Sequence, residues 1–224
     1  MKRLNVCAFF LAGFLATQVM SAQEAVRPRG LPVQTASFIS DDDGGVVQIV
    51  PMGLTPAGPR KANAAPVMKS IRQVSVFLGG AWAEQSVRSR EASLRDLAGH
   101  VQFPPLHTQN IGVLPASPSV EDFAELEDPV NDLTIQKKLV EMLGSKALPA
   151  PDASTVFVVF LAPGVRLTVG NHTAGVHFAA YHNLVHVEAG ELRYVVVPFN
   201  ENARHHATAA SLAIVNTVFN PASH

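Results

Sequence analysis

One run of seven residues strongly limits the folds that this chain can adopt. Residues 155–161 read Thr-Val-Phe-Val-Val-Phe-Leu and contain no charged side chain. A strand with one face in water alternates apolar and polar residues, whereas a strand covered on both faces is apolar throughout. The run therefore predicts a central strand with a layer of the molecule on each of its faces.

Other segments supply neighbours for this strand. Residues 74–78, Val-Ser-Val-Phe-Leu, end at a pair of glycines and predict a second buried strand. Residues 184–187 and 192–197 are separated by Glu-Ala-Gly-Glu, which is typical of a β-hairpin. The chain therefore contains at least four candidate strands for one sheet.

Two helices are expected between these strands. Residues 84–97 contain good helix formers and place Val87, Leu94 and Leu97 on one face. A second helix is predicted over residues 132–144, with an N-cap, an apolar spacing of four and three, and a closing glycine, at Asp132, Ile135, Leu139, Met142 and Gly144. Helices and strands together predict an α/β fold, or alternatively α+β, in which a layered mixed sheet has flanking helices.

The amino-terminal segment has the features of a secretory signal peptide. Lys2 and Arg3 precede the apolar run 6–16, and small residues follow at Ser21-Ala22. We therefore expect a signal peptide over residues 1–22 and a secreted or periplasmic location. The run is too short to span a bilayer, so no transmembrane segment is expected after cleavage.

The rest of the chain divides by composition. Residues 23–65 are rich in proline and glycine and predict a mostly irregular arm with one short strand at 46–50. Residues 66–224 are expected to form the folded domain. Cleavage after residue 22 leaves 15 Lys and Arg against 18 Asp and Glu, a net charge of −3 that argues against nucleic-acid binding. The only cysteine, Cys7, lies in the leader, so no disulfide is expected.

Histidines are concentrated near the carboxyl end. Six of the nine lie between residues 172 and 206, and the pair His182 and His186 has a spacing that puts both side chains on one face of a helix or a strand. Imidazole is a common zinc ligand, so this pair is a candidate metal site. Scattered surface or hydrogen-bonded histidines remain the alternative, and the pair His205-His206 is expected in a solvated polar loop.

At this point the sequence resembles a known family. Segments that are similar to those of the EXORDIUM, or phosphate-induced, family and its bacterial metallopeptidase-like relatives occur in the family order over residues 65–221. They are Ala65-Pro66-Val67-Met68, residues 74–82, 132–143, Leu148-Pro149-Ala150-Pro151-Asp152, residues 156–165, Ala180-Tyr181-His182 and residues 194–198.

The resemblance implies a zincin-like fold and places a functional helix near the carboxyl end. Members of the family resemble zinc peptidases because this helix carries Ser/Ala-His-Glu-Leu-x-Glu, in which the His and the second Glu are metal ligands and the first Glu is a general base. Residues 210–211 and 217–221 match the flanks of that motif. Leu212 stands in place of the ligand His, Ala213 in place of the base, and Asn216 in place of the ligand Glu.

Besides this alignment, two other interpretations of the region remain open. Residues 207–219 also read as a plain packing helix with an apolar stripe at Leu212, Val215, Val218 and Phe219. Alternatively, Ser223-His224 is the beginning of the motif in a truncated reading frame, with His224 as a metal ligand. The alignment on residues 210–221 and the alignment on Ser223-His224 both predict that the chain does not hydrolyse peptides. Both also predict a domain that lacks the C-terminal part found in relatives.

Two functions follow as hypotheses. The first is a secreted metallopeptidase-like protein without catalytic activity and without a cofactor, which acts by binding, or as a structural component, with a protein or cell-envelope partner. The second is an active secreted zinc-dependent hydrolase whose ligands come from residues 172–206, namely His182 and His186, or from sequence beyond His224.

Overall fold

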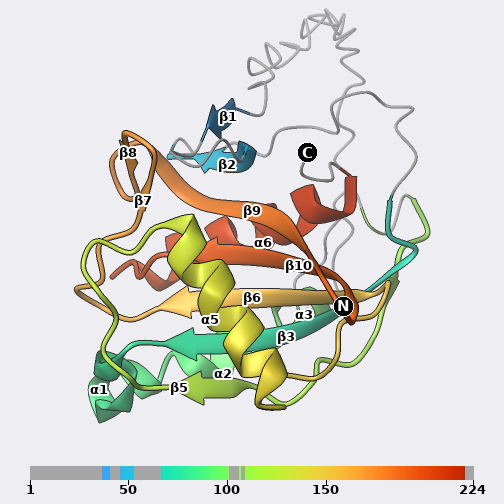
Figure 1. The fold of residues 1–224 in the computed structure, drawn as a ribbon, viewed down its shortest axis with the longest axis horizontal. Helices are drawn as coiled ribbons and strands as arrows, with labels where there is room; N and C mark the ends of the chain where they lie inside the picture. The colour runs from blue at the N-terminus through green and yellow to red at the C-terminus, as the bar shows by residue number, and fades with distance from the viewer. Residues whose placement is uncertain (1–36, 41–45, 53–66, 101–105, 107–108, 220–224) are drawn as a thin grey trace, which may run out of the picture. The chain divides into compact units, whose positions relative to one another are not determined.

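The computed structural model describes residues 37–40, 46–52, 67–100, 106 and 109–219, all of which belong to one compact unit. The predicted signal peptide, residues 1–22, lies outside the described residues, as does His224. Figure 1 shows a sheet that curls between helices on its two faces.

Eight strands form the main sheet. Its order is β1-β2-β9-β10-β6-β3-β4, and β5 also pairs with β3. The pairs β10–β6, β6–β3, β3–β4 and β3–β5 are parallel, whereas β1, β2, β9 and β10 run antiparallel to one another in turn. The strands are β1 Ser37–Ser40, β2 Val46–Pro51, β3 Ser70–Leu78, β4 Gly112–Val113, β5 Val120–Asp122, β6 Thr155–Leu161, β9 Phe178–Val187 and β10 Gly190–Val197.

The central strand is the one that the apolar run predicts. Every residue of β6 is buried, and Val159 is paired with Val76 of β3 on one side and Val196 of β10 on the other. The expected hairpin is also present as β9 and β10, although both strands are longer than predicted and only Glu188 and Ala189 join them.

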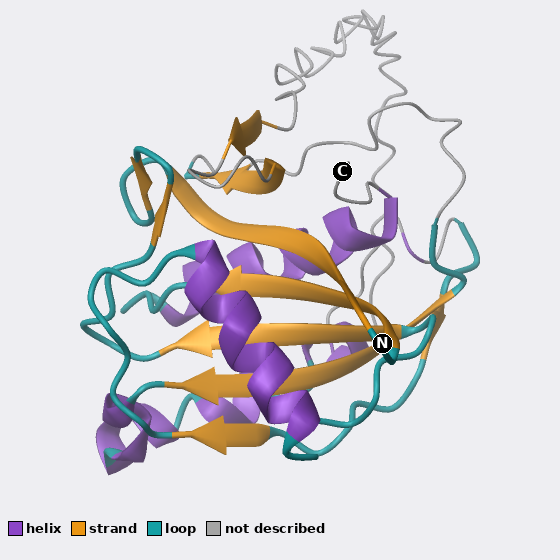
Figure 2. Ribbon diagram, in the orientation of Figure 1, coloured by secondary structure: helices purple, strands orange, loops and turns teal. Residues whose placement is uncertain are grey.

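Helices cover both faces of the sheet (Figure 2). On one face α5 (Asp132–Gly144) packs Ile135, Leu139 and Met142 against residues of β6 and β10. On the other face lie α6 and four single-turn helices, η1 Gly80–Ala83, α1 Gln85–Arg88, α2 Glu91–Leu94 and α3 Leu97–His100. The predicted α/β architecture, a layered mixed sheet with flanking helices, is confirmed.

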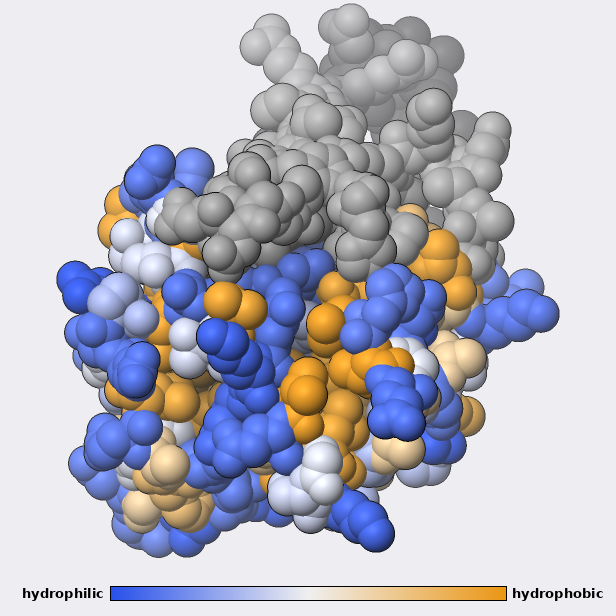
Figure 3. Space-filling view, in the orientation of Figure 1, coloured by the Kyte–Doolittle hydropathy of each residue, from blue (hydrophilic) through white to orange (hydrophobic). Residues whose placement is uncertain are grey.

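The outer surface on the α5 side carries mostly hydrophilic side chains with smaller hydrophobic patches (Figure 3). Within the described residues, no helix has the length and apolar character needed to cross a bilayer.

The predicted helix over residues 84–97 is wrong in its continuity, because the segment forms separate single turns. Two buried polar side chains of β3 explain one break. Gln73 Nε2 donates to the Leu94 carbonyl at 2.8 Å, and Ser75 Oγ donates to the carbonyls of Leu94 and Arg95 at 3.2 Å. These carbonyls are held by the sheet, and the Ala98 amide donates to Gln73 Oε1 at 3.0 Å, so the helical ladder does not continue.

The N-cap of α5 is also one residue away from the expected position. Asn131 is the cap, and its Oδ1 accepts a hydrogen bond from the Thr134 amide at 2.9 Å. Asp132 is the first helical residue and turns inward, where it is 1 % exposed. Its carboxylate accepts bonds from Tyr194 Oη at 2.7 Å, Asn183 Nδ2 at 2.9 Å and Gln136 Nε2 at 2.8 Å, which compensate for its burial.

The segment before residue 66 contributes strands to the sheet. β2 confirms the strand expected at 46–50, and it pairs antiparallel with β9 through Ile49 and Tyr181. β1 was not expected from the composition, and it pairs with β2. The main-chain pairing to β9 therefore places described residues of the predicted arm in the same sheet as the domain.

Gly79, directly after β3, provides a test of the packing at the carboxyl edge of the sheet. Its φ is +109°, and a Cβ there would lie 2.7 Å from the Cβ of Ala162. We expect Gly79→Ala to lower the free energy of unfolding by about 2 to 3 kcal/mol, because it adds backbone strain to a steric clash.

Gly144→Ala is the matched control, because nothing lies within 4 Å of the added Cβ and the residue is the last of α5. It should be neutral or stabilise by up to about 1 kcal/mol. Urea denaturation of both variants measures the difference, and equal stabilities would contradict the proposed clash.

Candidate functional site

The long carboxyl-terminal helix α6 spans Ala203–Phe219 and therefore begins four residues before the segment that predicted it. Asn202 starts it, because its Oδ1 accepts bonds from the amides of Arg204 and His205, both at 3.1 Å. The expected polar loop at His205-His206 is therefore wrong. These residues form the first turn of α6, where His205 is exposed and His206 is 1 % exposed.

The three motif positions all lie on α6. Ala213 is completely buried, whereas Leu212 and Asn216 are half-buried. Of the predicted stripe, Val218 and Phe219 are buried, whereas Leu212 and Val215 are half-buried and pack against the core. The buried face instead consists mainly of small residues and a histidine, namely His206, Ala209, Ala210, Ala213, Ile214, Thr217 and Val218. Small side chains let the helix lie close to the sheet, so packing distance decides which face turns inward.

The candidate metal ligands His182 and His186 do not converge. His182 lies in the middle of β9 and is buried, and burial lowers the pKa of its imidazole to about 3. His186 is exposed and four residues further along the strand, about 13 Å away along its axis. Across the part of the chain that the structure describes, no group of three or more His, Cys, Asp or Glu could hold a metal ion.

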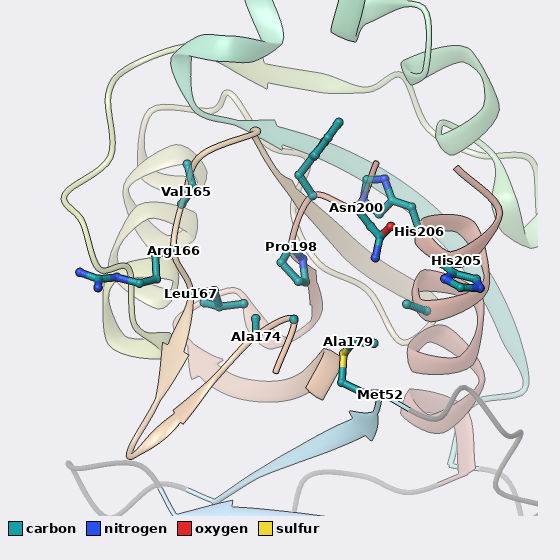
Figure 4. A pocket seen from close by; sticks show the side chains of 13 residues that line it. Met52, Val165, Arg166, Leu167, Ala174, Ala179, Pro198, Asn200, His205 and His206 are labelled. Carbon is teal, nitrogen blue, oxygen red and sulfur yellow. The ribbon is translucent and has the colours of Figure 1, made fainter. Parts of the chain in front are cut away.

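A different group of residues forms a cavity of about 140 Å³ at one edge of the sheet. Here the parallel strands β6 and β10 end, the antiparallel strand β9 begins, and α6 starts. Figure 4 shows side chains that enter from the segments after β6 and β10 and from α6. The lining residues are Met52, Val165, Arg166, Leu167, Ala174, Gly175, Ala179, Pro198, Phe199, Asn200, His205, His206 and Ala209.

His206 is the buried polar group of this cavity. Neither of its ring nitrogens has a hydrogen-bond partner within the described part of the chain. Its neighbours are aromatic, because its ring meets Phe160 edge-on with centroids 5.5 Å apart and Phe199 with centroids 5.7 Å apart. Burial, and secondarily the charge of Arg90, lowers the pKa of His206 to about 4. The imidazole is therefore neutral at pH 7.

Arg90 contacts the loop between β10 and α6, next to His206. Its guanidinium lies 4.7 Å from the Phe199 ring centroid, and it donates to the backbone carbonyl of Asn200 at 2.5 Å and to that of Glu201. These bonds fix the loop between β10 and α6 and place a positive charge near the cavity. Backbone carbonyls carry no net charge, so the two bonds do not neutralise the guanidinium.

The outer rim is more polar. The Arg166 side chain extends away from the cavity (Figure 4), where its Nε lies 3.5 Å from Asp128 Oδ1 in an exposed ion pair. Asn200 Oδ1 accepts from the Asn202 amide at 2.9 Å. The described lining residues include no carboxylate.

Two further histidines lie on or just after the small hairpin of β7 (Thr168–Val169) and β8 (His172–Thr173). The rings of His172 and His177 meet edge-on with centroids 5.2 Å apart, and His177 Nδ1 accepts from the Thr173 amide at 3.0 Å. This contact closes the turn that follows β8, so we assign it a structural role.

The chain matches no family model, no curated protein and no solved structure. The function of this chain is therefore inferred from the geometry of α6 and the cavity, together with the sequence resemblance. The sequence pattern does not indicate His206 as a site residue, because it predicts a helix that begins at residue 207. The capping residue Asn202, followed by good helix formers, was the signal that could have located it.

The buried neutral histidines predict a loss of stability in mild acid. His182 and His206 have folded-state pKa values of about 3 and about 4, below the ordinary value of 6.5. As the pH falls below 6.5, these histidines become protonated in the unfolded chain but remain neutral in the folded chain. The stability that they contribute is therefore present above pH 6.5 and is lost below it. We expect each histidine to remove about 2 kcal/mol between pH 6 and pH 4.5.

Urea denaturation at several pH values measures this loss. His206→Phe should reduce the pH-dependent fall by about half, because one of the two groups is removed. His186→Gln, at an exposed position of the same strand as His182, is the control and should leave the fall unchanged. An identical pH profile for His206→Phe and the parent chain would contradict the assignment.

Proposed function

We propose that this chain is a metallopeptidase-like protein of the EXORDIUM type that has lost hydrolytic chemistry and acts outside the cytoplasm by binding. The carrying observation is the identity and burial of the residues on α6. Leu212, Ala213 and Asn216 occupy the motif positions, and none of the three offers an imidazole or a carboxylate. A peptidase of this type needs those groups to hold the metal and to polarise its bound water.

The packing of α6 supports the loss of function at the position of the general base. Ala213 is fully buried among Ala210, Ile214 and core residues of the sheet. The Thr217 hydroxyl donates to the Ala213 carbonyl at 2.9 Å, within the same buried face. This position is therefore filled as part of the hydrophobic core, and a carboxylate there would need polar partners that an apolar core does not supply.

The same helix supports a zincin-like relationship as the finer part of the proposal. α6 carries the motif frame and packs on the face of a mixed sheet next to β9, the strand that contains Tyr181-His182. The resemblance includes both of these segments, and the proposed secretion or export rests on the predicted signal peptide.

Zinc binding and peptide hydrolysis test the proposal directly. The purified chain without its predicted signal peptide, incubated with excess zinc and dialysed, should retain clearly less than one zinc per chain and should not cleave a mixed peptide library. Metal analysis and mass spectrometry of the peptides are the measurements.

The opposite result has a specific form. Stoichiometric zinc together with peptide cleavage, both lost in the double variant His182→Gln and His186→Gln, would overturn the proposal in favour of an active zinc hydrolase. Thermal denaturation of the double variant is the control for folding, because His182 is buried.

Restoring a carboxylate at the buried position should be costly. We expect Ala213→Glu to lower the free energy of unfolding by about 3 kcal/mol or more, because it buries a charge in the packed face of α6. Arg204→Glu places the same residue at an exposed site in the first turn and should change stability by less than about 1 kcal/mol. Thermal or urea denaturation measures both, and tolerance of Ala213→Glu would indicate that the position is still open to catalytic chemistry.

A further inference from the structure

We propose that the cavity beside His206 binds a small aliphatic carboxylate of about six non-hydrogen atoms. The inference deepens the proposed function and rests on it only in that it gives the binding protein a ligand. It depends on the cavity, not on the motif positions of α6.

The position of the cavity is one that favours ligands. It lies at the carboxyl ends of the parallel strands β6 and β10, beneath the first turn of α6. In open α/β sheets, ligands bind at this edge because loops diverge there and leave a crevice. The lining comes from the segments that follow β6 and β10, from Ala179 of β9 and from the first turns of α6.

The volume limits the ligand. The cavity measures about 140 Å³, and a cavity of about 150 Å³ is large enough for a molecule of the size of benzene. An acid with a short branched chain is therefore accommodated, whereas a long-chain lipid is not.

His206 identifies the polar end of the ligand. A buried polar atom without a hydrogen-bond partner destabilises the fold by about 1 to 3 kcal/mol, and His206 has two such atoms. Both nitrogens are enclosed in this structure, and a turn of the ring about its Cβ–Cγ bond brings the N–H of the neutral imidazole to the cavity, where a carboxylate oxygen satisfies it. The half-buried Asn200 amide, on the same cavity wall, offers further donors.

Charge favours an anion over a neutral or cationic ligand. Arg90 acts on His206 with a positive charge, and the positive end of the 17-residue helix α6 lies in the same place. Arg166, from the segment after β6, points away from the cavity and pairs with the exposed Asp128, and Glu201 lies exposed in the loop before α6. Neither carboxylate lines the cavity, and the residues that line it carry no negative charge, so the lining itself favours an anion.

The remaining walls define an apolar end. Val165, Leu167, Ala179 and Pro198 line the cavity, together with the ring of Phe199. A branched aliphatic chain fills such a space and removes its own apolar surface from water. The two ends together predict an amphipathic acid rather than inorganic phosphate or sulfate.

Three ligands of similar size and different charge test the proposal. Isobutyrate, isobutyramide and isobutylamine are titrated into the full chain at pH 7, and binding is followed by calorimetry and by the ¹⁵N shifts of the histidine side chains. We expect isobutyrate to bind and to move the His206 resonances, with the amide at least about tenfold weaker and the amine not bound.

Two variants separate the polar end from the volume. His206→Phe keeps an aromatic ring but removes both nitrogens and should weaken isobutyrate binding about tenfold or more. Ala179→Leu keeps His206 and fills the cavity from a half-buried position, so it should abolish binding. His186→Gln is the control with unchanged affinity, and thermal denaturation verifies that each variant is folded.

Several results would overturn the proposal. They are equal binding of acid and amide, unchanged affinity in His206→Phe, and no binding to the parent chain. Binding of acetyl-Gly-Val without binding of isobutyrate would replace the free acid by the carboxyl end of a peptide. Peptide hydrolysis by a chain that binds isobutyrate would refute only the proposed loss of hydrolysis. A chain that neither hydrolyses peptides nor binds isobutyrate would refute only the ligand proposed for the cavity.

Discussion

The burial of β6 on both faces is the constraint on which the rest of the structure depends. A strand with seven consecutive buried residues needs hydrogen-bonded neighbours on both edges and a covering layer on both faces. β3 and β10 supply the edges, and α5 and α6 with the short helices supply the layers. The parallel pairing also gathers the carboxyl ends of β6 and β10 at one edge, which is where the cavity forms.

The two faces of this sheet use polar groups differently. On the α5 face, the buried carboxylate of Asp132 is matched by donors from Tyr194, Asn183 and Gln136. Burial and the adjacent carboxylate raise the pKa of Tyr194 well above its ordinary value, so its hydroxyl remains a donor. On the α6 face, His206 lacks partners among the described residues. A satisfied network stabilises and fixes a fold, whereas an unsatisfied group beside a cavity is available for recognition.

Local patterns predicted the elements better than their ends. The apolar run, the hairpin and α5 were recovered because their signals lie within a few residues of each other. The helix over residues 84–97 was not, because side chains of β3 hold the carbonyls of Leu94 and Arg95. The spacing of residues within the helical segment cannot predict a hydrogen bond from a strand about 20 residues earlier in the chain. The strand β1 was missed because its pairing with β2 outweighs a composition typical of loops.

By itself, the sequence determined the layered α/β class, the central strand and the absence of imidazole or carboxylate at Leu212, Ala213 and Asn216. These follow from residue identity and short-range spacing. Only the tertiary structure decided that His182 and His186 lie apart, that Ala213 faces the core, and that His206 is buried beside a cavity. Such properties depend on how closely α6 packs against the sheet, which is set by side chains far apart in the chain.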